Sequence, residues 1–307
     1  MKDSREIKLP NFLIVGAAKC GTTSLYYYLK EHPEIYMSPV KEPKFITSNF
    51  LKFPFAGVGD EEVEKNIVKS FKDYCQLFEN VKGEQAIGEA SADNLYYYEK
   101  SISYIKKYLG SPRIIIILRN PVERAYSAYL HLVRDKRESL SFEEALKKEE
   151  MRKKQNWEFI WFYKDVGFYY RQVKAYLDSF QSVRVYLYDD LLKNTLSVIQ
   201  DICEFLGVDN SFTPDVNEKY NVSLIPRSRW LHRFLTQPNL LKNAVKSFLK
   251  PVISDRQLAQ LVENTKALNL YKPQMKEKTR KYLAKHYQND ILKLQKLIDR
   301  DLTHWLS

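Results

Sequence analysis

The sequence is poor in cysteine and has no Cys-x-x-Cys pair. Its 307 residues include only three cysteines, Cys20, Cys75 and Cys203, which are far apart along the chain. Such spacing indicates neither a structural zinc site nor a disulfide framework. Scattered cysteines of this kind favour a protein that works in a reducing compartment.

Export and membrane signals are also missing. Residues 1–8 are polar and contain no apolar core of a signal peptide, and no stretch approaches the length of a membrane span. We therefore expect a cytoplasmic protein without a membrane span. The chain has no internal repeat or low-complexity tract, and 44% hydrophobic residues are ample for a sizeable core. We predict a single domain over residues 1–307, with insertions.

The formal charge of +11 indicates anionic partners, such as a nucleotide, an acidic glycan, a nucleic acid or a membrane surface. Charge alone does not choose among these partners, because a lysine-rich solvated surface has the same composition. The choice has to come from local motifs.

The most informative motif follows an apolar run at residues 12–15. The run breaks into a loop with Gly16, Lys19 and Gly21, and then resumes as a helical pattern. The two glycines have the spacing of a P-loop, in which backbone N–H groups and a helix N-terminus surround an anion. The lysine, however, lies inside the loop, and Thr22 occupies the place after the second glycine. The segment predicts a phosphate cradle of an unusual kind.

A second apolar strand, at residues 113–118, ends in Arg119. Nucleotide-hydrolysing P-loop proteins use a carboxylate at the end of a second strand to hold magnesium. A guanidinium at this place binds an anion directly, through paired hydrogen bonds. The combination predicts a phosphorylated donor that is bound without metal.

Strand and helix patterns alternate along the chain. We predict strands at 12–15, 35–37, 86–88, 113–118 and 183–188, and helices at 22–29, 61–80, 94–109, 121–133, 141–150, 166–180, 195–206 and 276–300. This alternation is typical of an α/β fold, and we predict a P-loop-like three-layer sandwich with a mostly parallel central sheet and helices on both faces. Ligands of such sheets bind beyond the carboxyl ends of the strands, where the first loop and Arg119 would meet.

Three segments together carry a resemblance to a known family: the cradle, the loop Lys41-Glu42-Pro43-Lys44-Phe45, and Arg119-Asn-Pro-Val-Glu-Arg-Ala-Tyr-Ser127. The chain resembles the sulfotransferases that use 3′-phosphoadenosine 5′-phosphosulfate, especially the branch with bacterial enzymes and heparan sulfate sulfotransferases. The resemblance covers most of the chain and implies that the cradle binds the 5′-phosphosulfate of the donor. The cradle residues concerned are Lys19, Cys20, Gly21, Thr22, Thr23 and Ser24. Lys19 would touch the bridging oxygen or the departing phosphate, where negative charge collects during transfer.

The same resemblance implies that Arg119 and Ser127 bind the 3′-phosphate of the donor. From the residues alone, Arg119 could instead form an ion pair, and Ser127 could bond a carbonyl of its own helix. A late segment, Lys219-Tyr-Asn-Val-Ser-Leu-Ile-Pro-Arg-Ser228, resembles the family's last nucleotide-binding loop. The resemblance implies that Tyr220, Arg227 and Ser228 contact the nucleotide. A basic surface loop without a binding role would have a similar sequence.

Glu42 occupies the place of a catalytic carboxylate in the glycan-modifying members of the family, and we predict that it is the general base. The alternative is a loop glutamate paired with Lys41 or Lys44. Glu89 and Ser91 follow a short strand and correspond to a segment that lines the acceptor cleft in relatives. Glu89 is the second choice as acid or base, and a histidine, the base in other branches of the family, is a further alternative. The heparan-type enzymes tend to have lysine at the place of Glu89, which weakens an assignment to an acidic polysaccharide acceptor.

The sequence thus predicts a metal-independent sulfotransferase that releases adenosine 3′,5′-bisphosphate. The acceptor would be a hydroxyl, or alternatively an amine, of a carbohydrate or small-molecule natural product, with no nucleic acid as partner. One alternative is a P-loop kinase or nucleotide hydrolase. The other is a basic protein that binds nucleic acid or an anionic surface. The sequence does not indicate an oligomeric state.

Overall fold

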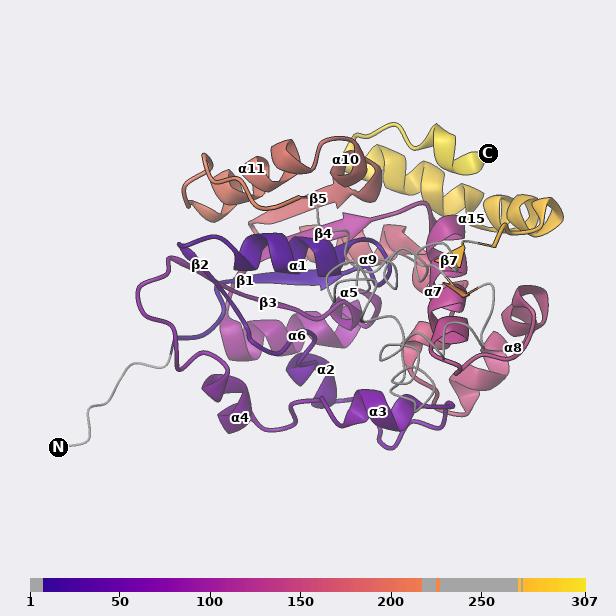
Figure 1. Ribbon diagram of the computed structural model, residues 1–307, viewed down its shortest axis with the longest axis horizontal. Coiled ribbons are helices and arrows are strands. Elements are labelled where there is room, and N and C mark those ends of the chain that lie inside the picture. The colour runs from indigo at the N-terminus through magenta and orange to yellow at the C-terminus, as the bar shows by residue number, and fades with distance from the viewer. Residues whose placement is uncertain (1–7, 217–224, 227–269, 272) are drawn as a thin grey trace, which may run out of the picture. The chain divides into compact units, whose positions relative to one another are not determined.

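In the computed structural model, residues 8–216, 225–226, 270–271 and 273–307 are described. Five strands form one sheet in the order β2-β3-β1-β4-β5, and every neighbouring pair is parallel. The strands are β1 (Phe12–Gly16), β2 (Ile35–Met37), β3 (Ala86–Ala90), β4 (Arg113–Leu118) and β5 (Val183–Leu187). Because all strands are parallel, their carboxyl ends lie along one edge of the sheet, which is where the loops after β1 and β4 meet (Figure 1).

Helices cover the two faces of this sheet. On one face α1 (Thr22–Lys30) contacts α11 (Thr195–Leu206), and on the other α6 (Tyr98–Leu109) contacts α9 (Tyr169–Ser179) (Figure 1). The longest helix among the described residues, α15 (Glu277–Ile298), packs against α9. This arrangement confirms the predicted α/β three-layer sandwich.

The remaining helical segments are short or lie beyond the strand ends. They are α2 (Phe45–Ser48), α3 (Asp60–Glu64), α4 (Phe71–Gln76), α5 (Asp93–Tyr96), α7 (Pro121–Arg134), α8 (Phe142–Lys154) and α10 (Tyr188–Lys193), with 3₁₀ turns at Phe159–Trp161, Asp165–Gly167 and Thr303–Leu306. None of the helices within the described ranges is long and apolar enough to cross a membrane.

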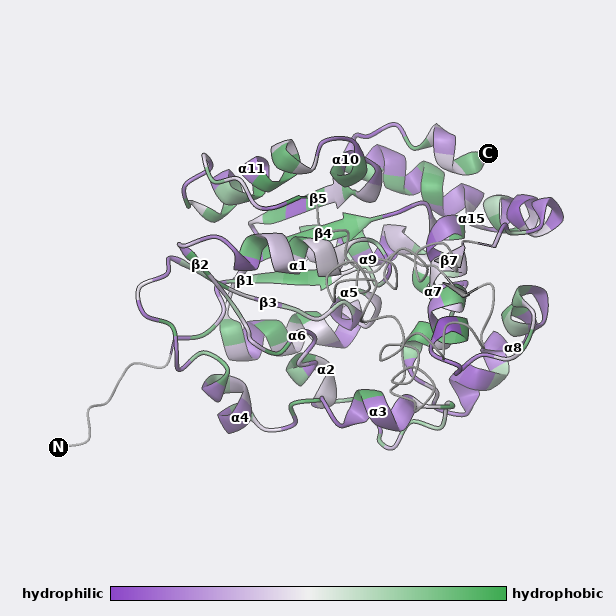
Figure 2. Ribbon diagram, viewed as in Figure 1, coloured by the Kyte–Doolittle hydropathy of each residue, from purple (hydrophilic) through white to green (hydrophobic). Residues whose placement is uncertain are grey.

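The central strands of the sheet are buried in the core. The run Ile114–Leu118 in β4 is completely buried, as is Phe12–Val15 in β1. Strands of a parallel sheet are buried on both faces, so they are apolar without alternation. Figure 2 shows β1 and β4 in green between helices that carry purple residues on their outer sides.

The predicted helix at 61–80 is wrong, because two short helices, α3 and α4, replace it. Ser70 interrupts the pattern: its hydroxyl accepts the backbone N–H of Asp73 at 3.0 Å and caps the start of α4. Just before this cap, the N–H of Val68 bonds the carbonyl of Pro43 at 2.9 Å, so a loop from elsewhere in the chain takes a backbone bond that a helix would have used.

Smaller differences concern helix ends. The predicted helix at 94–109 is divided at Tyr97 into α5 and α6, and the helix predicted from 166 begins at Tyr169 after a 3₁₀ turn. The helix predicted to end at 150 continues as α8 to Lys154. The short helix α2 was not predicted.

Contacts divide the described chain into two compact units. The first contains residues 8–129, 140–216 and 276–307, and with them the five-stranded sheet. The second contains residues 130–139 and, of residues 222–275, the described ones at 225–226, 270–271 and 273–275. In it, β6 (Ile225–Pro226) and β7 (Leu270–Tyr271) form an antiparallel pair. The single domain predicted over residues 1–307 stays a prediction. The predicted site residues that the structure describes all lie in the first unit.

Candidate anion-binding and catalytic site

The loop between β1 and α1 is a narrow cradle that admits only glycine at two positions. A Cβ on Gly16 would lie 2.5 Å from the Cβ of Leu95, and a Cβ on Gly21 would lie 2.9 Å from a ring carbon of Tyr188. Gly21 also has φ of 103°, which side chains other than glycine rarely adopt. The packing therefore explains both glycines of the motif.

Helix α1 begins directly after Gly21 and offers its N-terminus to the loop. Gly21 supplies no side-chain cap, and the first turn of α1 contains no acidic residue. The first backbone N–H groups of a helix have no partner within the helix, and they carry a partial positive charge that favours an anion. The charge at the start of α1 therefore favours an anionic group such as phosphate or sulfate.

Lys19 and Arg119, which are 100 residues apart in sequence, meet at this cradle. The Arg119 guanidinium donates to the backbone carbonyl of Lys19 at 3.4 Å and lies 4.8 Å from the ring centre of Tyr188. A backbone hydrogen bond also connects the loop to β4: the N–H of Ala17 donates to the carbonyl of Ile117 at 2.8 Å. The structure thus brings the Arg119 guanidinium to the backbone of the loop that contains Lys19.

The other predicted donor-binding residues differ in exposure. Thr23 and Ser24 are partly exposed, whereas Thr22, Cys20 and Ser127 are buried. The thiol of Cys20 lies 3.6 Å from the hydroxyl of Tyr169, and burial raises the pKa of this thiol. Cys20 therefore faces the core, and only its backbone is suited to an anion in the cradle. Tyr220, Arg227 and Ser228 lie outside the described residues.

The Lys-Glu-Pro loop is fixed to the end of β3 by backbone bonds. The N–H of Glu42 donates to the carbonyl of Ala90 at 2.9 Å, and the N–H of Lys44 donates to the Ser91 hydroxyl at 3.1 Å. Glu42 and Lys44 both have left-handed backbone angles, with φ of 59° and 51°. Residues without a left-handed preference adopt such angles only where the surroundings require it. The loop is therefore held in one conformation beside β3.

The carboxylate of Glu42 is surrounded by ammonium groups. Its Oε1 lies 2.7 Å from Nζ of Lys41, and the side chain is 31% exposed. Burial acts to raise the pKa of Glu42, but the charges of Lys41 and Lys44 outweigh it. With a smaller contribution from Lys19, the pKa falls to about 2. The ion pair weighed as an alternative for Glu42 is thus present, and Lys19 lies close enough for its charge to act on this carboxylate.

A buried polar network lies behind the loop. Nζ of Lys44 is 2.8 Å from Oε1 of Glu158, and these side chains are only 7% and 4% exposed. The Thr47 hydroxyl donates to Asp93 at 2.7 Å, and burial raises the pKa of Asp93 to about 6 against the lowering effect of Lys44. Sequence reasoning assigned no role to Glu158, which follows Lys44 by 114 residues and lies in no sequence motif.

Glu89 belongs to the same buried region. It is 1% exposed and accepts the Ser91 hydroxyl at 3.0 Å. Burial raises the pKa of Glu89 to about 8, with smaller contributions in the same direction from Asp93 and Glu42. Glu89 is therefore largely protonated at neutral pH, whereas Glu42 is ionised. Ser91 connects the two segments, because its oxygen also accepts the N–H of Lys44.

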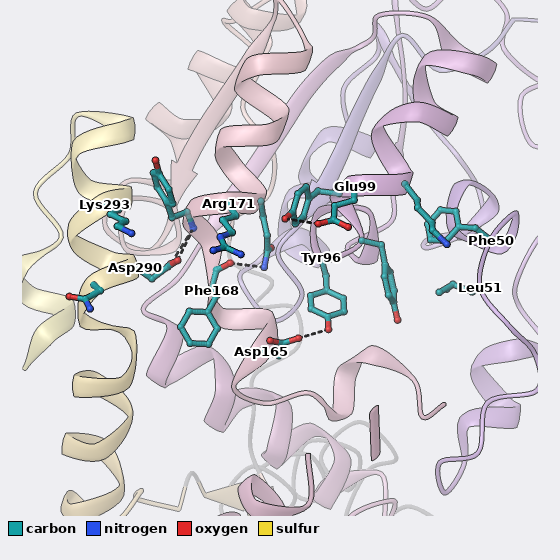
Figure 3. A pocket seen from close by; sticks show the side chains of 15 residues that line it. Phe50, Leu51, Tyr96, Glu99, Asp165, Phe168, Arg171, Asp290 and Lys293 are labelled. Atoms are coloured by element: carbon teal, nitrogen blue, oxygen red, sulfur yellow. Dashed lines mark hydrogen bonds between the residues drawn. The ribbon is translucent and has the colours of Figure 1, made fainter. Parts of the chain in front are cut away.

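A separate cavity of about 690 Å³ lies between α6, α9 and α15 (Figure 3). It is lined by aromatic rings such as Tyr96 and Phe168 and by charged side chains such as Asp290 and Lys293. Figure 3 shows the Tyr96 hydroxyl directed at the Asp165 carboxylate, 2.6 Å away. None of the predicted site residues lines this cavity.

The described parts of the chain contain no group of three or more His, Cys, Asp or Glu side chains that could hold a metal ion.

Comparisons with known proteins match the chain to one family. A family model described as the sulfotransferase family matches residues 10–214. A crystal structure of a sulfotransferase from Alicyclobacillus acidocaldarius has 36% sequence identity and a TM-score of 0.77, and the match covers 98% of this chain and 100% of that one.

Curated relatives are similar over shorter stretches. Carbohydrate sulfotransferase 15 of Homo sapiens is 30% identical over 167 residues, which cover 44% of this chain and 29% of the relative. Bifunctional heparan sulfate N-deacetylase/N-sulfotransferase 2 of Homo sapiens is 31% identical over 133 residues, which cover 40% of this chain and 13% of the relative. The matches thus span less than a third of the length of either relative.

Proposed function

This chain belongs to the sulfotransferase family, and we propose that it transfers a sulfuryl group from 3′-phosphoadenosine 5′-phosphosulfate to an acceptor hydroxyl. The observation that carries this proposal is the contact between Arg119 and Lys19, which joins two cationic segments at one cradle. A donor with a 5′-phosphosulfate and a separate 3′-phosphate needs two neighbouring anion sites. The cradle with Lys19 suits the first group, and Arg119 with Ser127 suits the second.

The transfer needs no covalent intermediate with the protein. The acceptor oxygen attacks sulfur, the bond between sulfur and the bridging oxygen breaks, and the electron pair leaves with the phosphate of adenosine 3′,5′-bisphosphate. Lys19 and the N–H groups at the start of α1 stabilise the negative charge that develops on this leaving group. The acceptor proton passes to Glu42.

Glu42 is suited to this role once a donor is in place. In the donor-free protein the neighbouring lysines keep its carboxylate ionised, with a pKa of about 2, and a carboxylate of such low pKa is a weak base. A bound phosphosulfate adds negative charge next to Lys19, one of the cations that lower the pKa. Donor binding therefore raises the basicity of Glu42, so that proton removal is strongest when both substrates are present.

A carbohydrate is the first choice of acceptor, because two relatives are named as a carbohydrate sulfotransferase and a heparan sulfate N-sulfotransferase. A hydroxylated natural product is the second, and an amine is a third. Glu89 and Ser91 border the Glu42 loop from β3 and are candidates for shaping the acceptor side. Their hydroxyl–carboxyl bond is buried, so we propose that they act through the loop and not by direct contact.

A P-loop kinase or nucleotide hydrolase is the competing function. It would use a carboxylate with magnesium at the end of β4, where this chain has Arg119 in contact with the cradle. A basic protein that binds nucleic acid is the non-enzyme alternative, and its polynucleotide binding would be insensitive to Lys19→Ala.

Calorimetry with adenosine 3′,5′-bisphosphate, with and without EDTA, tests the proposal. We expect tight binding that EDTA does not change and that Arg119→Ala weakens, with weaker binding of ATP and magnesium. Transfer of labelled sulfate from the donor to a panel of carbohydrates then identifies the acceptor. Preference for ATP with magnesium, or no binding of either nucleotide, would contradict the proposal.

A further inference from the structure

Glu123 lies between two arginines at the proposed 3′-phosphate site. Its Oε1 is 2.5 Å from Nη2 of Arg280, whereas its Oε2 is 3.7 Å from Nη2 of Arg119. Glu123 lies in the first turn of α7, and Arg119 precedes this helix by two residues, so the two side chains are neighbours in sequence. In this structure the closer partner of Glu123 is instead Arg280, which comes from α15, 157 residues further along the chain.

The position of Arg280 is fixed independently of Glu123. At the start of α15, the Thr279 hydroxyl donates to Glu143 of α8 at 2.7 Å, and Nζ of Lys276 lies 3.1 Å from the same carboxylate. These bonds hold the first turn of α15 beside α7 and α8 (Figure 1). Arg280 therefore lies beside Glu123 because the start of α15 is bound to Glu143 of α8.

We propose that Arg280 is a positioning residue for the donor: by binding Glu123 it keeps the Arg119 guanidinium available for the 3′-phosphate. The inference rests on the proposed function and adds a residue to it. Without Arg280, the Glu123 carboxylate would turn to Arg119 and compete with the phosphate for the same N–H groups. With Arg280, the Glu123 carboxylate has a closer guanidinium partner and competes less with the phosphate for Arg119.

The geometry of Arg119 supports this division of roles. Its guanidinium is already oriented by the carbonyl of Lys19 and by the ring of Tyr188. A close bond to Glu123 would add no orientation that these contacts do not give, and it would occupy the groups that the phosphate needs. All three side chains of the triad are partly exposed, at 16%, 22% and 30% for Arg119, Glu123 and Arg280, so we expect a moderate effect on affinity.

A double-mutant cycle with adenosine 3′,5′-bisphosphate as the probe tests the inference. Arg280→Ala should weaken binding about threefold to tenfold in calorimetry. Glu123→Gln should bind as well as the unchanged protein or better, and adding Arg280→Ala to Glu123→Gln should cost nothing further. Lys281→Ala is the matched control, because Lys281 is the next residue of α15 and is 78% exposed.

Each outcome of the cycle decides the question. If Arg280→Ala weakens binding equally with and without Glu123→Gln, Arg280 contacts the donor itself and the inference is wrong. If Arg280→Ala has no effect on binding in the protein that retains Glu123, the inference is also wrong. Circular dichroism and the unfolding temperature of each variant separate these results from a loss of fold. Failure of the unchanged protein to bind the nucleotide, by contrast, would overturn the proposed function and not only this inference.

Discussion

The Arg119 guanidinium donates a hydrogen bond to the Lys19 carbonyl across 100 residues of sequence, at a distance of 3.4 Å. This contact joins the ends of β1 and β4, two adjacent strands of the sheet. Because both strands are parallel and buried, neither end can shift without disturbing the core. The Arg119 guanidinium is therefore held beside the loop that contains Lys19 by the buried frame of the sheet.

Replacement of Glu42 by glutamine should abolish most of the transfer activity. The amide cannot take the acceptor proton, so we expect kcat to fall about 100-fold or more, while the Kd for adenosine 3′,5′-bisphosphate changes little. The rate is measured with labelled donor under saturating conditions. Glu62→Gln is the control, since Glu62 is a 67% exposed glutamate that is also paired with a lysine. Full activity of Glu42→Gln would exclude Glu42 as the base.

Removal of the Lys41 charge should shift the pH dependence of the reaction. The pKa of Glu42 is about 2 because cations oppose burial, and Lys41 is the first of these cations. Without it, the pKa rises toward the ordinary value for glutamate, about 4.3. The acid decline of kcat/KM, which lies below the measurable range in the unchanged protein, should then lie at higher pH in Lys41→Gln. Lys41→Arg keeps the charge and should show no such decline.

Replacement of Glu89 by glutamine should stabilise the fold at alkaline pH. The folded-state pKa of Glu89, about 8, lies above its unfolded value, so its contribution to stability is present in acid and is lost as pH rises through 8. Glutamine cannot ionise and still accepts the Ser91 hydroxyl. At pH 9 we expect the unfolding temperature of Glu89→Gln to exceed that of the unchanged protein by about 2–4 °C or more, with a smaller difference at pH 5.

The control for this comparison is Glu79→Gln, which alters an exposed glutamate of the same unit. Its unfolding temperature should follow the unchanged protein at both pH values. An equal shift of Glu89→Gln at pH 5 and pH 9 would show that the carboxyl group is not titrating in this range.

Breaking the buried pair of Lys44 and Glu158 should destabilise the protein strongly. Glu158→Gln leaves the Lys44 ammonium buried without its counter-charge, which typically costs about 3–5 kcal/mol. The combined change Lys44→Met with Glu158→Leu removes both charges, so most of this loss should be recovered. Urea unfolding of the single and double variants measures the difference. The exposed pair of Lys65 and Glu62 is the comparison, where Glu62→Gln should cost less than about 1 kcal/mol. If the double variant were no more stable than Glu158→Gln, packing and not charge would dominate here.

Local sequence sufficed for the parts of the structure that depend on neighbouring residues. The apolar run of β4 predicted a buried strand, and the glycine spacing after β1 predicted the cradle, because close packing and backbone angles at Gly16 and Gly21 leave no room for a side chain. The fold class and the family followed from the same patterns and are confirmed. The assigned roles of Lys19, Glu42 and the other site residues stay predictions, as does a cytoplasmic location.

Long helices with a weak pattern were harder to predict. The break between α3 and α4 depends on Ser70, which carries a recognisable capping signal, and on a bond from Val68 to Pro43, which no local pattern reveals. A backbone group bonds whichever partner the fold brings near, and that partner is known only once the loops are placed.

The sequence by itself predicted which residues are suited to bind an anion, because a glycine-spaced loop with a lysine follows one strand and an arginine ends another. The tertiary structure alone decided the electrostatic state of the site. The pKa values of Glu42 and Glu89 diverge because one carboxylate lies among lysines and the other is buried beside further carboxyl groups. In the same way, Arg280 reaches Glu123 only because α15 folds back beside α7. Coulomb interactions depend on distance in space, and distance in sequence does not predict it.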